Sequence, residues 1–363
     1  MRILHSAAML SFSPGIYKQM SWENKSALKL GIDFSSKIFC PIGVYPEGDI
    51  VEFSSFQKPK NIVDKFICWI KLRLEYFNWL MDQQKNFDII LLRYSVHDPF
   101  LLKFLKETKI PVYLVHHTLE LPDLNSFNTI GKIRAFLEGS IGNKCIAHSY
   151  GLICVTNEIK EFELERISLN KIEKPSYIYP NGILLEDNRI LNDNRGNIPE
   201  LLFLASYFFD WHGLDLLLKS VQKDNSEFIL HVIGKVDDWQ KDIVKGDPRV
   251  VFHGLKTTHE IQSISEKCWL GLSSFSLDRK GMQEACTLKV REYLSIGLPV
   301  YSGHKDVFPT NFEYYHFGEA NIKSILSYAE KMRGTNRITV EREANEYISK
   351  EKLVMNLYNY FNK

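Results

Sequence analysis

The chain has 363 residues, of which 45% are hydrophobic, and its formal net charge at pH 7 is +1. At about 100–200 residues per domain, this length predicts two domains, each able to bury a core. The near-neutral charge shows neither the basic footprint of a nucleic-acid binder nor an acidic tail, so we expect no nucleic-acid partner.

The six cysteines are spread along the chain and form neither a C-x-x-C pair nor a zinc-type spacing. They are typical of buried thiols in a reducing compartment. The N-terminus has no signal-peptide pattern, and no run of about 18 apolar residues suggests a membrane-spanning helix. We therefore expect a cytoplasmic protein, with peripheral contact to the cytoplasmic face of the inner membrane as an open alternative.

Short apolar runs that end in polar or turn residues alternate with helical patterns in the first half of the chain. Strands are predicted at residues 2–5, 87–92, 112–115 and 151–155, and a helix at 16–30 that ends at Gly31. Strands that alternate with helices indicate βαβ units and a parallel sheet.

A polar stretch at residues 185–200 predicts a linker, after which the pattern repeats. Strands are predicted at 201–204, 228–234, 250–254, 269–273 and 298–301, with helices at 213–221, 288–296 and about 340–361. We expect an α/β fold of two Rossmann-like, doubly wound parallel-sheet domains that face a cleft. The predicted domains are 1–182 and 190–342, and residues 343–363 form a helix that crosses back toward the first domain. In such folds, ligands bind beyond the carboxyl ends of the strands.

The strongest chemical signal is at residues 281–300, where Glu284 and Glu292 flank seven residues. Thr287 is a predicted N-cap, with a hydroxyl that accepts a backbone N–H at the start of the helix. The free N–H groups at this helix start, around Thr287, Leu288 and Lys289, favour an anion such as a diphosphate. Glu284 is then placed to reach a sugar, and Glu292 a ribose. An ordinary amphipathic helix with Glu292 in solvent is the alternative.

This order of a carboxylate, a helix start and Gly297-Leu298-Pro299-Val300 resembles the donor-binding element of retaining GT-B glycosyltransferases of family 4 (glycosyltransferase group 1). The run Lys-Val-Arg-Glu-Tyr-Leu at 289–294 looks like the subgroup that builds bacterial surface polysaccharides. The resemblance covers nearly the whole chain. Residues 179–183, Tyr-Pro-Asn-Gly-Ile, are similar to the family's interdomain signature, and Gly15 matches its glycine loop near the donor phosphates.

The resemblance also assigns a histidine in the first domain. In the family, a histidine that follows a strand touches the donor sugar; His117 fits this position best, and His116 is the reserve. Without the family, a histidine at a strand end is more often structural.

The chain departs from the family in one loop. Many members carry an arginine and, five residues later, a lysine that hold the diphosphate, but Tyr207 and His212 stand at these places here. We expect Lys289, Arg279, Lys280, His212 and the helix N-terminus to meet the phosphate charge instead. Arg279 and Lys280 are equally consistent with a solvated loop.

The resemblance implies a retaining hexosyltransferase that uses a nucleotide diphosphate sugar, with UDP favoured over GDP. The implied acceptor is a hydroxyl of a glycan or lipid-linked glycan, in capsule or lipopolysaccharide O-antigen synthesis. The implied mechanism is front-face attack with domain closure. No Asp-x-Asp triplet is present, so we predict no metal and no cofactor. A catalytically silent GT-B partner subunit and a GT-B nucleotide-sugar epimerase remain alternatives.

Residues 61–81 form a predicted amphipathic helix with lysines among its apolar positions. Such a helix fits an anionic membrane surface, but a core helix with a wide apolar face is the favoured alternative. The acceptor loops are expected at 95–99 and 118–129.

Overall fold

The computed structural model describes residues 1–125, 129–168, 173–185 and 192–362, and the chain divides into two compact units. Unit 1 comprises Met1–Pro180 and Lys350–Lys363, and unit 2 comprises Asn181–Ser349. The sequence-based boundaries were residue 182 for the first domain, 190 for the second and 343 for the returning segment. Part of the predicted linker, residues 186–191, and the part of the predicted acceptor loop at 126–128 lie outside the described residues.

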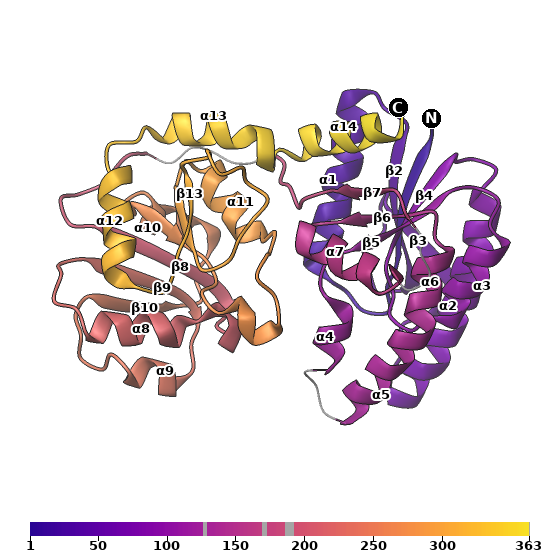
Figure 1. Ribbon diagram of the computed structural model, residues 1–363, viewed down its shortest axis with the longest axis horizontal. Coiled ribbons are helices and arrows are strands. Elements are labelled where there is room, and N and C mark those ends of the chain that lie inside the picture. The colour runs from indigo at the N-terminus through magenta and orange to yellow at the C-terminus, as the bar shows by residue number, and fades with distance from the viewer. Residues whose placement is uncertain (126–128, 169–172, 186–191, 363) are drawn as a thin grey trace. The chain divides into compact units, whose positions relative to one another are not determined.

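Unit 1, whose strands are drawn in indigo to magenta in Figure 1, contains a seven-stranded sheet in the order β3-β2-β1-β4-β5-β6-β7. All neighbouring strands are parallel. The strands are β1 (Ile3–Ala8), β2 (Phe34–Ile42), β3 (Val51–Gln57), β4 (Ile89–Arg93), β5 (Val112–His116), β6 (Gly151–Cys154) and β7 (Ser176–Ile178). The strand order reverses between β1 and β4, which makes this the switch point where doubly wound sheets bind ligands.

The helices of unit 1 cover both faces of this sheet. They are α1 (Pro14–Leu30), α2 (Ile62–Gln83), α3 (Pro99–Glu107), α4 (Glu120–Asn125), α5 (Thr129–Leu137), α6 (Asn143–His148), α7 (Asn157–Glu165) and α14 (Lys350–Phe361). Helix α1 ends as predicted at Gly31, whose φ of 64° is the left-handed conformation that glycine adopts without strain. Helices α1 and α14 pack against each other in one core cluster, which includes Ala27, Leu353 and Leu357.

Unit 2 contains a six-stranded parallel sheet in the order β10-β9-β8-β11-β12-β13, with its switch point between β8 and β11. The strands are β8 (Glu200–Tyr207), β9 (Ile229–Lys235), β10 (Val250–Gly254), β11 (Leu270–Leu272), β12 (Val300–Ser302) and β13 (Tyr315–Phe317). The helices are α8 (Leu214–Gln222), α9 (Asp238–Asp242), α10 (Thr258–Ser265), α11 (Leu288–Ser295), α12 (Ile322–Met332) and α13 (Arg337–Ile348). Two doubly wound parallel sheets confirm the predicted fold class.

The predicted final helix is wrong in one respect, because it is two helices, α13 in unit 2 and α14 in unit 1. The break lies at Ser349, which has an extended conformation with ψ at 119°. There the backbone N–H of Ile183 donates to the carbonyl of Ile348 at 2.8 Å, and Ile183 forms a parallel bridge with Ser349. The carbonyl of Ile348 is therefore not available for the intrahelical hydrogen bond that it would accept in a continuous helix.

Helix α2 packs against the core in its later turns, and its contact with a membrane stays a prediction. Its later turns are core, since Leu72, Tyr76 and Leu80 are at most 3% exposed. Its early turns leave Phe66 and Ile67 exposed. Within the described part of the chain, no helix is both long enough and apolar enough to cross a membrane.

Candidate active site

Three loops of unit 2 meet at the carboxyl ends of β8, β11 and β12, around the switch point of the sheet. The N–H of Phe275 donates to the carbonyl of His212 at 2.9 Å, and the N–H of Gly303 to the carbonyl of Ser274 at 3.0 Å. Gly213 is required here: its φ is 65°, and a Cβ would lie 2.9 Å from the Cβ of Phe275. The sequence therefore packs the loop that carries His212 directly against the loop after β11.

His212 closes a short 3₁₀ turn, Asp210–His212, just after β8. Its Nδ1 accepts the backbone N–H of Phe209 at 3.0 Å. Burial lowers the pKa of His212 to about 4, and the positive charge of Lys289 lowers it further. The imidazole is thus neutral at pH 7 with its proton on Nε2. It can donate a hydrogen bond to an anion, but it cannot supply a charge.

The predicted helix after the carboxylate motif is confirmed as α11, which starts directly after Thr287. Thr287 has the extended backbone of an N-cap, but its hydroxyl caps no N–H, and Oγ1 is buried without a hydrogen-bond partner. The predicted side-chain cap is therefore wrong. The position of Thr287 is fixed instead through its carbonyl, which accepts Arg291 Nη1 at 3.3 Å. The side chain of Thr287 therefore leaves the first N–H groups of α11 uncapped, and such groups can bind an anion.

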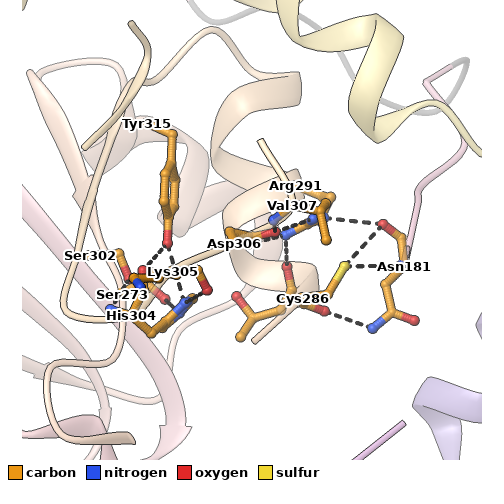
Figure 2. A network of polar contacts seen from close by, with 11 residues as sticks. Asn181, Ser273, Cys286, Arg291, Ser302, His304, Lys305, Asp306, Val307 and Tyr315 are labelled. Carbon is orange, nitrogen blue, oxygen red and sulfur yellow. Dashed lines mark hydrogen bonds and ion pairs between the residues drawn. The ribbon is translucent and has the colours of Figure 1, made fainter. Parts of the chain in front are cut away.

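A buried ion pair holds α11 against the loop after β12 (Figure 2). Arg291 is fully buried and binds both carboxylate oxygens of Asp306, with Nη2 2.6 Å from Oδ1. Its Nε donates to the carbonyl of Asn181 at 3.1 Å, and Asn181 Nδ2 donates to the carbonyl of Cys286 at 2.7 Å. Asn181, which belongs to the predicted interdomain signature, thus holds the segment that leads into α11 in place.

Lys289, in the first turn of α11, is a half-buried cation. Burial lowers its pKa to about 8, and the carboxylate of Glu292 partly opposes this. Burial lowers the pKa values of His212 and of His304, and the positive charge of Lys289 lowers both further. In the described residues, Lys289 has no hydrogen bond or ion pair of its own. Its charge is thus poorly compensated by the protein, as expected of a residue that binds an anion.

Glu284 and Glu292 lie on either side of this helix start, as predicted. Glu284 is half-buried in the loop before α11, where it forms a parallel backbone bridge with Lys305. The N–H of Ala285 donates to the carbonyl of Lys305 at 3.0 Å, which ties that loop to the one after β12. Glu292 is half-buried in the second turn of α11.

The other proposed phosphate ligands are already engaged. Arg279 binds both oxygens of Asp215, at 2.8 and 3.0 Å, and also the carbonyl of Asp210. Lys280 Nζ lies 4.5 Å from the centre of the Trp211 ring. Tyr207, at the family's arginine position, donates to Asp237 Oδ2 at 2.7 Å. The geometry therefore favours Lys289 over Arg279 as the cation for a diphosphate.

In unit 1, His117 follows β5 and is half-buried, and its Nε2 is buried without a hydrogen-bond partner. Burial and the charge of Arg93 hold its pKa well below the usual range, so the ring is neutral. His116 is fully buried and engaged, with Nδ1 3.2 Å from Glu120. Both histidines leave Nε2 buried without a hydrogen-bond partner, but His116 is engaged through Nδ1, whereas no hydrogen bond of the His117 ring is seen in the described residues. Gly15 is an exposed residue in the first turn of α1, with open space around it.

Arg93 is a residue that sequence analysis missed. It ends β4, beside the switch point, and is half-buried without a hydrogen bond or ion pair in the described residues. The strand register aligns Arg93 with Val115, so Arg93 and His117 lie on the same face of the sheet. Arg93 could have been identified in the sequence as a cationic residue directly after the apolar run Ile-Ile-Leu-Leu.

One cluster of described side chains has the spacing of a metal site. Ligand atoms of His116, Glu120 and Glu163 lie within 4.8 Å of one another. The other oxygen of Glu163 binds Arg166 Nη1 at 2.6 Å, so a cation already neutralises part of the cluster. The predicted absence of a metal cofactor stays a prediction.

No family model and no curated protein matches the sequence. Solved structures do match over the whole chain. The lipopolysaccharide outer core galactosyltransferase WaaB is 13% identical, with 99% of each chain covered and a TM-score of 0.68. HepE from Anabaena, solved in complex with UDP, is 11% identical, with 100% of each chain covered and a TM-score of 0.62.

The chain has the GT-B fold. The same fold is shared with the UDP-GlcNAc 2-epimerase of Methanocaldococcus jannaschii, at 14% identity, 100% coverage of each chain and a TM-score of 0.54. Within the GT-B fold, activity has to be argued from the site.

Proposed function

We propose that this protein is a glycosyltransferase that moves a hexose from a nucleotide diphosphate sugar to a hydroxyl of a glycan or lipid-linked glycan. The observation that carries this proposal is the start of α11 in unit 2. There Lys289 forms no hydrogen bond or ion pair in the described residues, its charge is only partly offset by Glu292, and the buried hydroxyl of Thr287 lacks a partner. Together with the free N–H groups of the helix, they form a site whose chemistry matches a diphosphate.

This site also accounts for the departure from the family pattern in the loop after β8. His212, at the family's lysine position, donates a neutral hydrogen bond through Nε2, because its Nδ1 already accepts from Phe209. Lys289 supplies the positive charge. When the bond between the sugar and the diphosphate breaks, negative charge develops on the leaving phosphate, and these groups are already oriented to stabilise it.

Two carboxylates have separate proposed roles. Glu284 precedes the helix and orients the hydroxyls of the sugar ring, whereas Glu292 in the second turn binds the ribose of the nucleotide. We propose retention by front-face attack. The acceptor oxygen bonds to the anomeric carbon as the bond to the phosphate breaks, and the departing phosphate takes the acceptor's proton. His117 keeps the role in sugar binding that the family resemblance assigns to it.

The proposed donor is a UDP-sugar, and the proposed acceptor is a glycan of the bacterial surface. HepE was solved with UDP, and WaaB is a galactosyltransferase of the lipopolysaccharide outer core; both share the fold over full length. We propose that no metal takes part, because Lys289, His212 and the helix N-terminus meet the diphosphate charge. The surface-polysaccharide pathway remains part of the proposal.

A thermal-shift panel of UDP, GDP, ADP and CDP, with and without EDTA, tests the donor site. A ligand that binds only the native state raises the melting temperature by mass action. We expect UDP to stabilise the protein, with EDTA having no effect. A shift that EDTA abolishes would contradict metal-free binding, and no shift with any nucleotide would favour the silent-subunit alternative.

Product analysis separates a transferase from an epimerase. With a panel of UDP-hexoses and no acceptor, a transferase releases at most slow free hexose of unchanged identity. An epimerase converts UDP-GlcNAc to its 2-epimer. Detection of that epimer by NMR would refute the transferase proposal, and an α-linked product from an α-linked donor would support retention.

A further inference from the structure

Helix α5 of unit 1 exposes its large apolar side chains and buries its small ones. Its buried positions are Gly131 and Ala135. Its exposed side chains include four large apolar residues: Ile130 at 66%, Ile133 at 58%, Phe136 at 78% and Leu137 at 40%. A surface helix of a globular domain normally places such residues against the core. The apolar face of α5 is therefore not explained by the packing of unit 1.

The four apolar residues form one continuous stripe. At about 100° per residue, they fall within an arc of about 120° on the helix. Lys132 and Arg134, both exposed, lie about 40° beyond the two edges of this stripe by the same geometry. The helix contains no acidic residue. An apolar stripe bordered on both sides by cations is the pattern of a helix that lies in the interface of an anionic bilayer.

The early turns of α2 also expose apolar side chains, although Asp64 lies in the first turn. Phe66 is 67% exposed and Ile67 is 47% exposed, and Lys65 beside them is also exposed. Both helices border the loop between β4 and α3. Arg73 of α2 forms an ion pair with Asp98 at 3.1 Å, and Arg134 Nε of α5 donates to His97 Nε2 at 3.0 Å.

We propose that α5, together with the first turns of α2, docks unit 1 onto an anionic lipid bilayer. The apolar stripe enters the boundary between headgroups and acyl chains, while Lys132, Arg134 and Lys65 meet the lipid phosphates. The charges favour lipid over a second copy of this chain. A two-fold dimer through α5 would bring the cations of both helices to one rim, and α5 offers no acidic partner for them.

Vesicle co-sedimentation of the full-length protein tests this surface without any donor or acceptor, so its outcome is independent of the proposed transferase activity. We expect binding to phosphatidylcholine vesicles that contain about 30% phosphatidylglycerol, and much weaker binding to phosphatidylcholine alone. Because the attraction is partly electrostatic, binding should weaken as NaCl rises from about 0.05 to 0.5 M.

Three variants separate the contributions. Combined replacement of Ile133→Ser and Phe136→Ser should lower the partition coefficient by at least about tenfold. Lys132→Glu should lower it by several-fold and reduce its salt dependence. The matched control is Leu255→Ser, which removes a side chain that is 72% exposed on unit 2 and should leave binding unchanged. All four side chains are exposed, so the melting temperatures should match that of the wild type.

Three results would overturn the proposal. The first is a wild-type protein that binds neither kind of vesicle. The second is binding that survives the double serine replacement, since another surface would then be responsible. The third is a dimer, detected by light scattering, that the double replacement abolishes, because the stripe would then belong to an interface between copies of the chain.

Discussion

At the scale of single residues, Lys289 should set the pH dependence of nucleotide binding. Its pKa is lowered to about 8 by burial, so it is mostly protonated at pH 7 and mostly neutral at pH 9. A diphosphate binds the protonated form. We therefore expect the affinity for UDP to fall by about tenfold between pH 7 and pH 9, measured by calorimetry.

Substitutions of Lys289 check this assignment. Lys289→Arg keeps its charge over this range and should bind UDP with little dependence on pH. Lys289→Gln should bind weakly at both pH values. A wild-type affinity that stays constant from pH 7 to pH 9 would assign the phosphate charge to another residue.

The two carboxylates beside α11 should differ in the kinetic parameter that they control. Glu284→Gln should lower kcat by about 100-fold or more with folding intact, because it acts on the sugar as charge develops. Glu292→Gln should raise the donor KM by about tenfold and change kcat little, because a ribose contact is equal in the ground and transition states. Wild-type turnover in Glu284→Gln would remove Glu284 from the catalytic residues.

Sequence analysis placed these residues well where the information was local. The positions of Glu284 and Glu292 about the start of α11 follow from the spacing, the N-cap position and the glycine at the end of the helix. The engagement of Arg279 could not be predicted, because its partner Asp215 is 64 residues away. The free hydroxyl of Thr287 was likewise hidden, since it depends on side-chain contacts in the folded loops.

At the scale of elements, Glu23 of α1 should anchor α14 to unit 1. Its carboxylate is buried and accepts from His5 and Ser36, both at 2.7 Å, and from Tyr179 at 2.9 Å. Lys350, the first residue of α14, lies 3.9 Å away. We expect Glu23→Gln to destabilise the protein by about 3 kcal/mol at pH 7, because it leaves the buried Lys350 without its counter-charge.

The sign of the pH dependence follows from the pKa of Glu23. Burial alone would raise this pKa, but the contacts with His5 and Lys350 lower it from 4.5 to about 2. The stabilisation is therefore complete above pH 4.5 and is lost as the pH falls toward 2. The difference between wild type and Glu23→Gln in urea unfolding should shrink across that range.

A second pair between the same helices provides the control. Lys29 of α1 and Glu351 of α14 lie 2.9 Å apart, but Lys29 is 52% exposed. Glu351→Gln should cost less than about 1 kcal/mol, as exposed ion pairs do. Equal losses in the two variants would mean that burial of Glu23 is not what matters.

The elements that sequence analysis missed share a physical cause. Strand β2 contains two serines, a lysine and Pro41, and four of the seven residues of β3 are polar, so neither has the continuous apolar run used to find the others. Strands β7 and β13 have only three residues each. The break between α13 and α14 depends on Ile183, which is far away in the sequence.

At the scale of the whole molecule, the two units should respond separately to a nucleotide. The proposed contacts with UDP, at Lys289, Thr287, His212 and Glu292, all belong to unit 2. A ligand at 100 times its Kd stabilises the unit that binds it by about 2.7 kcal/mol. For a unit of this size, the shift in melting temperature should be about 5–10 °C.

Scanning calorimetry can resolve this response, because a protein with two cooperative units need not unfold in one step. We expect UDP to move one transition upward and to leave the other within about 1 °C. In Lys289→Gln, the same concentration of UDP should move neither transition appreciably, while both melting temperatures without ligand stay close to those of the wild type. If UDP instead shifts both transitions equally, nucleotide binding involves unit 1 directly or the units unfold as one. The Glu23→Gln variant distinguishes these cases: it should lower only the transition that UDP leaves unmoved, because Glu23 and α14 belong to unit 1.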